Sequence, residues 1–209
     1  MTENEFSDLR HIGKLWSKAP LAVRLVNLIT LYRIFAFPIL IALLLDGETE
    51  WFKWLLLACF LTDAIDGFLA RQFKATSVLG SKLDSIGDDL TVLAAIVGVC
   101  MLHWEFVEGN VLVIAPVIAL YLVQLGLALW RYGRISTFHT YLAKVAAVIT
   151  AVFLLTAFFF EPIWYPLFYL AIAATALDMM EEIALVLVMK EDRSDVKGLY
   201  WVLRERKRQ

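Results

Sequence analysis

Charged side chains are scarce in this chain of 209 residues. Lys, Arg, Asp and Glu together make up 19% of it, whereas 61% of the residues are apolar and the mean hydropathy is +0.72. A soluble domain has about 25% charged and about 45–50% apolar residues, so the composition excludes an ordinary water-soluble globule. It also excludes a disordered chain, because there is ample apolar surface to bury. We expect no nucleic-acid partner.

The chain has only two cysteines, and its first residues do not resemble a signal peptide. Cys59 and Cys100 both lie in apolar runs, which predicts two packed thiols and neither a disulfide nor a metal-binding pair. Residues 1–20 are polar and mixed in charge, without a short apolar stretch that ends in small residues. We therefore expect no cleavable signal peptide.

Long apolar runs dominate the rest of the chain. A membrane-spanning helix needs roughly 20 apolar residues, and the sequence offers six such runs. The predicted fold is therefore an all-α integral membrane protein with six transmembrane helices. We expect a membrane domain over residues 21–190, between a segment at 1–20 and a basic tail at 191–209. The six runs cover residues 21–45, 51–73, 78–102, 111–130, 141–160 and 163–189.

The basic residues are sorted to one side of this arrangement. Six spans place both termini on one side, together with the connections between spans two and three and between spans four and five. Lys and Arg concentrate there, whereas the opposite connections hold Lys53 and several acids. By the positive-inside rule both termini are cytoplasmic. The opposite acids are Asp46, Glu48, Glu50, Glu105, Glu108 and Glu161.

Both ends of the chain have features of membrane-surface segments. Leu9, Ile12, Leu15 and Trp16 repeat at helical spacing among basic residues, which predicts an N-terminal amphipathic interfacial helix. The tail combines apolar residues from Leu199 onward with a basic terminus suited to anionic headgroups. A plain topology anchor explains both segments equally well.

Four aspartates interrupt the second and third apolar runs. Asp63 and Asp66 are three residues apart, and Asp84 and Asp88 are four apart, so each pair shares one face of a helix. In mid-bilayer each carboxylate would cost about 2.5–3.5 kcal/mol, so they need water, a cation or a position near the membrane edge. A short polar connection lets the two helices run antiparallel and their carboxylate faces meet at the cytoplasmic end.

Clustered carboxylates repel one another unless a cation lies between them. Ligand sets made only of oxygen suit hard ions such as Mg²⁺ or Mn²⁺, and four carboxylates are enough for two ions. Two-metal sites favour displacement at phosphorus, because they neutralise a diphosphate and orient the attacking oxygen. Gly67 and Ala70 permit close approach to the helix, and Arg71 supplies a fixed cation for phosphate oxygens.

These residues form the pattern D-x2-D-G-x2-A-R-x8-G-x3-D-x3-D, which resembles the signature of the CDP-alcohol phosphatidyltransferases. The six-span length and cytoplasmic orientation are also similar to that family, so the resemblance extends over most of the chain. All eight fixed positions match. They are Asp63, Asp66, Gly67, Ala70, Arg71, Gly80, Asp84 and Asp88.

The resemblance implies transfer of a phosphatidyl group from CDP-diacylglycerol to an alcohol, with release of CMP. It implies that Asp63, Asp66 and Asp84 are metal ligands for two ions of Mg²⁺ or Mn²⁺, and that Asp88 is a ligand or the general base. Nucleotide or diphosphate contacts fall to Gly67, Ala70, Arg71 and Gly80. It further implies a homodimer in a bacterial or archaeal cell membrane, with the active site at the cytoplasmic interface. Asp89 lies outside the motif.

The first apolar run carries a second resemblance, to phosphatidylglycerophosphate synthases and some relatives. Asn27, Thr30 and Arg33 form an N-x2-T-x2-R run and line one helix face. We assign Asn27 and Thr30 to the nucleotide and Arg33 to the acceptor alcohol. An interhelical hydrogen bond with a snorkelling arginine explains the run equally well.

Further cations point to an acceptor that carries a phosphate, with glycerol 3-phosphate as the first choice. Arg131, Arg134 and Lys144 are the predicted acceptor-binding residues, although topology alone also explains the two arginines. Asp178, Glu181 and Glu182 in the sixth run either pair with these cations or form a separate proton or cation site.

Three alternatives remain open at this point. The same chemistry suits inositol phosphate, serine or inositol as acceptor. A small cation transporter would also bury carboxylates, but it predicts broken helices and no fixed Gly, Ala and Arg frame. An intramembrane prenyltransferase also uses aspartates with Mg²⁺, but its second pair of aspartates follows a different pattern, and its chain is generally longer.

Overall fold

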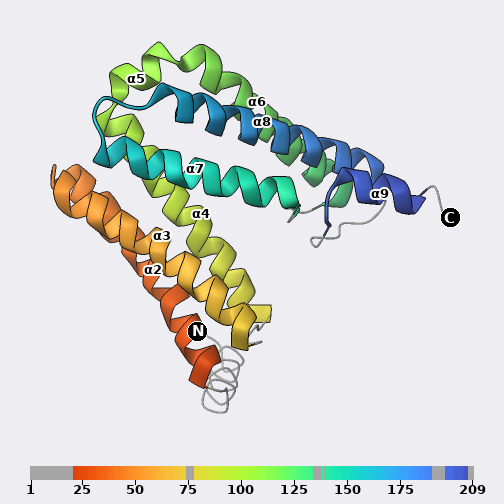
Figure 1. Cartoon of the computed structure of the whole chain (residues 1–209), viewed down its shortest axis with the longest axis horizontal. Coiled ribbons are helices and arrows are strands. Elements are labelled where there is room, and N and C mark those ends of the chain that lie inside the picture. Colours follow the sequence, from red (N-terminus) through yellow and green to blue (C-terminus); the bar gives the residue numbers. More distant parts are fainter. Residues whose placement is uncertain (1–20, 74–77, 134–137, 139, 190–195, 207–209) are drawn as a thin grey trace, which may run out of the picture. The chain divides into compact units, whose positions relative to one another are not determined.

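The computed structural model describes residues 21–73, 78–133, 138, 140–189 and 196–206, with backbone alone for 21–27, 29–30, 66–73, 78–82, 84 and 206. All regular structure in these residues is helical (Figure 1), which confirms the all-α prediction. The predicted N-terminal amphipathic helix lies outside the described residues. The helices are α2 (Leu21–Leu45), α3 (Thr49–Phe73), α4 (Val78–Leu102), α5 (Trp104–Gly109), α6 (Val111–Tyr132), α7 (Tyr141–Phe159), α8 (Tyr165–Val188) and α9 (Leu199–Arg206).

Six long helices coincide with the six apolar runs to within a few residues. In the described part of the chain, three helical stretches are long and apolar enough to cross a membrane: Ser85–Leu102, Val111–Tyr132 and Tyr141–Phe159. A shorter apolar stretch covers Leu31–Leu45 in α2. Charged side chains lower the hydropathy of α3 and α8, so composition and length mark these helices less clearly as spans.

The chain divides into two compact units, Met1–Gly98 and Val99–Gln209, with the boundary inside α4. In the first unit α2 and α3 run side by side (Figure 1). They are joined by a turn at Gly47, whose φ of 76° suits glycine. Their contact buries one stripe from each helix, as expected for close helix packing. The stripes are Ala36, Leu40 and Leu44 of α2, and Phe52, Leu56 and Cys59 of α3.

The packing of Cys59 confirms the expectation for this thiol. Its side chain is fully buried in the first unit, and both Cys59 and Cys100 are free thiols. A buried cysteine behaves as a small apolar residue. The first unit therefore has a continuous apolar interface between α2 and α3. In α3 this interface extends to Cys59, one helical turn before Asp63.

In the second unit α8 packs against both α6 and α7 (Figure 1). Thr150 of α7 and Thr175 of α8 share a hydrogen bond of 3.1 Å. The short helix α5 lies between the third and fourth predicted spans, and its Phe106 ring meets Phe168 edge-on at 4.9 Å. This aromatic contact packs the half-buried Phe106 of α5 against α8.

An apolar group, here called the end cluster, forms where α6, α8 and α9 come together. Phe138 is 1% exposed and lies at its centre, and Thr140 caps α7 by accepting a hydrogen bond from the N–H of Ala143 at 3.0 Å. The end cluster holds Phe138 and the start of α9 against α8. Its buried members are Ala128, Phe138, Leu185, Val186, Met189 and Val196.

Candidate active site

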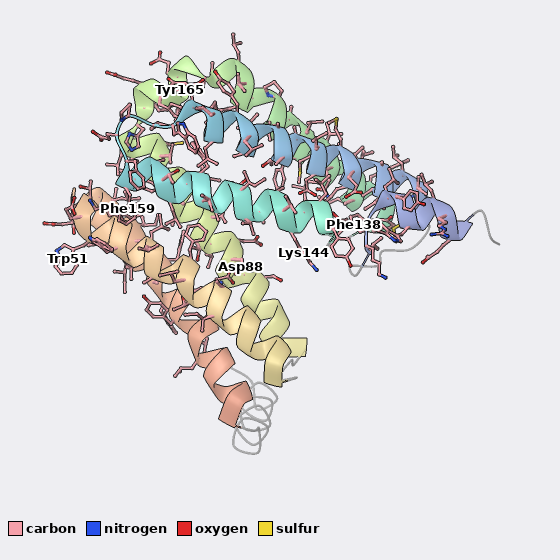
Figure 2. The ribbon with its side chains drawn as sticks, in the orientation of Figure 1. Trp51, Asp88, Phe138, Lys144, Phe159 and Tyr165 are labelled. Carbon is pink, nitrogen blue, oxygen red and sulfur yellow. The ribbon has the colours of Figure 1, made fainter. Side chains whose placement is uncertain are left out.

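The two pairs of aspartates lie on two successive helices, as predicted. Asp63 and Asp66 belong to α3, and Asp84 and Asp88 belong to α4. Asp88 lies on the half of α4 that begins at Val78 (Figure 2). Helical geometry over both stretches confirms that each pair shares a face. The side chains of Asp66 and Asp84 are outside the described part of the structure.

Asp63 and Asp88 converge on a single atom of a third helix. Nη1 of Arg33, in α2, donates a hydrogen bond to Oδ1 of Asp63 at 2.6 Å and another to Oδ1 of Asp88. Both contacts are ion pairs. Asp63 and Asp88 follow Arg33 in the sequence by 30 and 55 positions. The expectation that carboxylates from the second and third long helices meet is therefore confirmed for this pair.

The arginine is buried, whereas the two carboxylates are not. Arg33 has a side-chain exposure of 0%, against 41% for Asp63 and 43% for Asp88. The guanidinium thus approaches the two carboxylates from the protein interior, and their other surfaces face outward. This arrangement lets a substrate or an ion reach the carboxylates without passing the arginine.

Gly87 supplies the surface on which the arginine lies. A side-chain carbon placed on Gly87 would be 3.6 Å from Cβ, Nε and Cζ of Arg33. The backbone there is held by Thr91, whose hydroxyl donates to the carbonyl of Gly87 at 2.8 Å. Sequence analysis did not single out Gly87 or Thr91. The one available signal was a glycine directly before Asp88.

Arg33 was predicted either to bind the acceptor alcohol or to take part in an interhelical contact. Its hydrogen bonds with Asp63 and Asp88 are interhelical, but the sequence did not identify these two partners. Contacts at such sequence separations come from the packing of three helices, which the spacing of Asn27, Thr30 and Arg33 does not encode. The side chains of Asn27 and Thr30 lie outside the described part, although both residues belong to α2. Their nucleotide-binding role stays a prediction.

The remaining motif positions lie on the same two helices. Gly67, Ala70 and Arg71 belong to the last turns of α3, and Gly80 belongs to the first turn of α4. Only their backbone is described. Their predicted contacts with the nucleotide and its diphosphate therefore stay predictions, as do the metal-ligand roles of Asp66 and Asp84.

The predicted acceptor cations of the second unit have local partners. Arg131, in the last turn of α6, is exposed, and its Nε donates to the carbonyl of Met189 at 3.2 Å. Lys144, near the start of α7 (Figure 2), is exposed, with Nζ 5.9 Å from the centre of the Tyr141 ring. Arg134 lies outside the described residues. Their binding of an acceptor stays a prediction.

Two of the three acids of α8, Glu181 and Glu182, bind backbone groups of the second unit. Oε1 of Glu182 accepts a hydrogen bond from the N–H of Phe138 at 3.3 Å, and Oε1 of Glu181 accepts one from the N–H of Leu199 at 2.9 Å. Asp178 is 7% exposed. The sequence left two roles open for these acids, pairing with the cations or a separate proton or cation site. Among the described residues, backbone N–H groups are hydrogen-bond partners of both glutamates, while Arg131 donates to a carbonyl.

The residues present fit a divalent cation. Asp63 and Asp88 offer only carboxylate oxygens, the donors that Mg²⁺ and Mn²⁺ prefer, and they already converge from two helices on one positive group. Their exposure of about two fifths leaves oxygen surface for an ion. Among the described residues no group of three or more ligating side chains is assembled, and the side chains of the other two predicted ligands, Asp66 and Asp84, lie outside the described part.

Comparison with known proteins gives matches in sequence. The family model described as CDP-alcohol phosphatidyltransferase matches residues 23–188. A CDP-diacylglycerol--glycerol-3-phosphate 3-phosphatidyltransferase of Cereibacter sphaeroides is 36% identical over 75 residues, which cover 34% of each chain. A second protein with this name from Arabidopsis thaliana is 34% identical over 98 residues, 44% of this chain and 42% of its own length.

The chain therefore spans well under half the length of the curated relatives it matches. No solved structure matches it. The family model, in contrast, covers most of the chain and includes Arg33 together with all four aspartates of the motif. On that extent of agreement, the chain belongs to the CDP-alcohol phosphatidyltransferase family.

Proposed function

We propose that this protein transfers the phosphatidyl group of CDP-diacylglycerol to glycerol 3-phosphate, giving phosphatidylglycerophosphate and CMP. The observation that carries the proposal is the convergence of Asp63 and Asp88 inside a complete eight-position motif. The names of the two curated relatives support glycerol 3-phosphate as the acceptor. The product belongs to phospholipid biosynthesis.

The reaction is a displacement at the phosphorus that carries the diacylglycerol. The acceptor hydroxyl oxygen forms the new P–O bond, the bond of that phosphorus to the bridging diphosphate oxygen breaks, and CMP leaves with the electron pair. The hydroxyl proton passes to a carboxylate oxygen of Asp88, acting as general base. With 43% of its side chain exposed, Asp88 is accessible to an acceptor from the outer side of the cluster.

Asp63, Asp66 and Asp84, with Asp88 as a further ligand, would hold Mg²⁺ or Mn²⁺, in two ions. When bound, the ions neutralise the diphosphate charge and lower the energy of the leaving group. The chain's own part is to orient the lipid nucleotide: Asn27, Thr30, Gly67, Ala70, Arg71 and Gly80 are the proposed contacts. A phosphate on the acceptor would bind Arg131, Arg134 and Lys144, with Arg33 beside the reacting carboxylates.

The proposed setting is a cell membrane of a bacterium or archaeon. All six long helices would cross it, with both termini and the aspartates on the cytoplasmic side. There a lipid substrate and a water-soluble acceptor can meet. The proposed assembly is a homodimer surrounded by membrane lipids.

An acceptor screen tests this function. Purified protein in detergent receives CDP-diacylglycerol and Mg²⁺ or Mn²⁺, with glycerol 3-phosphate, inositol phosphate, serine or inositol in parallel reactions. We expect CMP release and a phosphatidylglycerophosphate product, identified by mass spectrometry, with glycerol 3-phosphate alone. A product with another acceptor would replace the proposed substrate and keep the chemistry. No CMP release with any acceptor or metal would overturn the proposal.

A further inference from the structure

We infer that Arg33 acts as a permanent cation between Asp63 and Asp88. It holds the two carboxylates together in the absence of metal and competes with a divalent ion for their oxygens. Arg33 is then a positioning residue. The inference rests on the proposed metal dependence, but it concerns how this chain prepares for the metal. It assigns Arg33 a task different from contact with the acceptor.

The charges of Asp63 and Asp88 make a cation necessary between them. Asp63 and Asp88 both place an oxygen on one guanidinium nitrogen, so two negative groups from α3 and α4 lie within a few ångströms of a shared point. Two like charges at such a separation repel strongly, because the effective dielectric at a protein surface is well below that of water. A positive group at that point removes the repulsion, and Arg33 provides it.

The packing of the first unit holds the Arg33 side chain in place. Its side chain is fully buried, and it lies along the α4 backbone at Gly87. Arginine remains protonated under all ordinary conditions, so the positive charge is permanent. α2 packs along α3 through the buried stripe described above. The cation is therefore delivered by the packing of the first unit and needs no ion from solution.

The guanidinium of Arg33 and a metal ion need the same carboxylate oxygens of Asp63 and Asp88. Oδ1 of each carboxylate faces Nη1, and an oxygen that accepts this hydrogen bond has fewer lone pairs for an ion. The arginine also repels an incoming cation. Binding of a divalent ion and bridging by Arg33 are thus coupled with opposite sign, which means that each weakens the other.

The experiment compares the full-length chain with Arg33→Gln and Arg33→Lys. Each protein is purified in detergent with Mg²⁺ and then treated with a chelator. Two quantities are measured: the unfolding temperature with and without Mg²⁺, and the affinity for Mn²⁺ from the electron paramagnetic resonance signal of the free ion. Neither readout requires turnover.

We expect the wild type to keep nearly the same unfolding temperature after chelation. Arg33→Gln should unfold at a much lower temperature without Mg²⁺ and recover when Mg²⁺ is added, because the ion replaces the missing charge. Its Mn²⁺ affinity should rise by about 5- to 150-fold, the usual range for coupled binding. Arg33→Lys retains a positive charge and should resemble the wild type without metal.

Lys53→Gln is the matched control. Lys53 is a cation of the same unit, paired with Glu50 of α3 at 2.6 Å, far along the helix from Asp63. Its loss should leave both the Mn²⁺ affinity and the effect of chelation unchanged. A change as large as that of Arg33→Gln would show a general charge effect and would overturn the inference.

The remaining outcomes separate the two proposals. Equal Mn²⁺ affinity in wild type and Arg33→Gln, or an equal loss of stability with and without Mg²⁺, would overturn the role of Arg33 alone. An Arg33→Gln protein that does not fold even with Mg²⁺ would do the same, since ion and arginine would not be interchangeable. If neither the wild type nor any variant binds Mn²⁺, the proposed metal-dependent function is overturned, and the competition between Arg33 and a metal ion is overturned with it.

Discussion

Glu181 of α8 accepts a hydrogen bond from the backbone N–H of Leu199, the first residue of α9, at 2.9 Å. A carboxylate at the start of a helix satisfies a free N–H group and interacts favourably with the helix dipole. Leu199 and Val202 of α9 pack on the end cluster from the same helix. This hydrogen bond, together with the packing on the end cluster, ties the position of α9 to α8.

Removal of the Glu181 carboxylate should loosen α9. We expect Glu181→Ala to lower the free energy of unfolding by about 0.5–2 kcal/mol, the cost of losing a helix cap. Limited proteolysis should then cleave faster within Leu199–Arg206. Glu205→Ala, which changes an exposed acid of the same helix, should cleave at the wild-type rate. Equal protection of Glu181→Ala and wild type would contradict this role.

Gly198 should not tolerate a side chain. Its φ of 145° is unfavourable for residues with a Cβ, and a Cβ there would lie 3.0 Å from Oε1 of Glu181 and 3.3 Å from the Trp201 ring. Backbone strain of this kind costs about 1–3 kcal/mol, so Gly198→Ala should lower the unfolding temperature. Gly126→Ala in α6, where nothing lies within 4 Å, serves as the control. A Gly198→Ala protein as stable as the control would refute the prediction.

Gly87 should accept alanine despite its place before Asp88. The added carbon would meet Arg33 at 3.6 Å, an ordinary van der Waals distance, and alanine favours a helix over glycine by about 0.5–1 kcal/mol. We expect Gly87→Ala to raise the unfolding temperature slightly, as measured in detergent after chelation. A marked decrease would mean that the guanidinium needs the bare backbone in order to reach the two carboxylates.

Asp88 should be essential for transfer and dispensable for folding. Asp88→Asn removes the proposed base, a group that contributes about 10²–10⁴-fold to rate, so CMP release should fall by at least that range. The neighbouring Asp89 is exposed and outside the motif, and Asp89→Asn should retain near wild-type rates. Wild-type transfer by Asp88→Asn, or an equal loss in both variants, would remove Asp88 from its assigned role.

The sequence by itself determined the fold class and the family. Apolar runs of about twenty residues allow few structures other than helices, because a backbone in lipid must satisfy its own hydrogen bonds, and the long helices begin and end close to those runs. The spacing of Asp63, Asp66, Asp84 and Asp88 was readable for a similar reason. Helical periodicity converts a local spacing into a shared face.

Only the tertiary structure decided which side chains bind one another across helices. The sequence left Arg33 as an acceptor residue or an interhelical contact, and the packing of α2 with α3 and α4 places its guanidinium on Asp63 and Asp88. It left Glu181 and Glu182 as partners for cations or as a separate proton or cation site, and they bind backbone N–H groups of Leu199 and Phe138. Periodicity fixes a residue's face on its own helix; the partner on that face depends on how helices pack, which no local spacing contains.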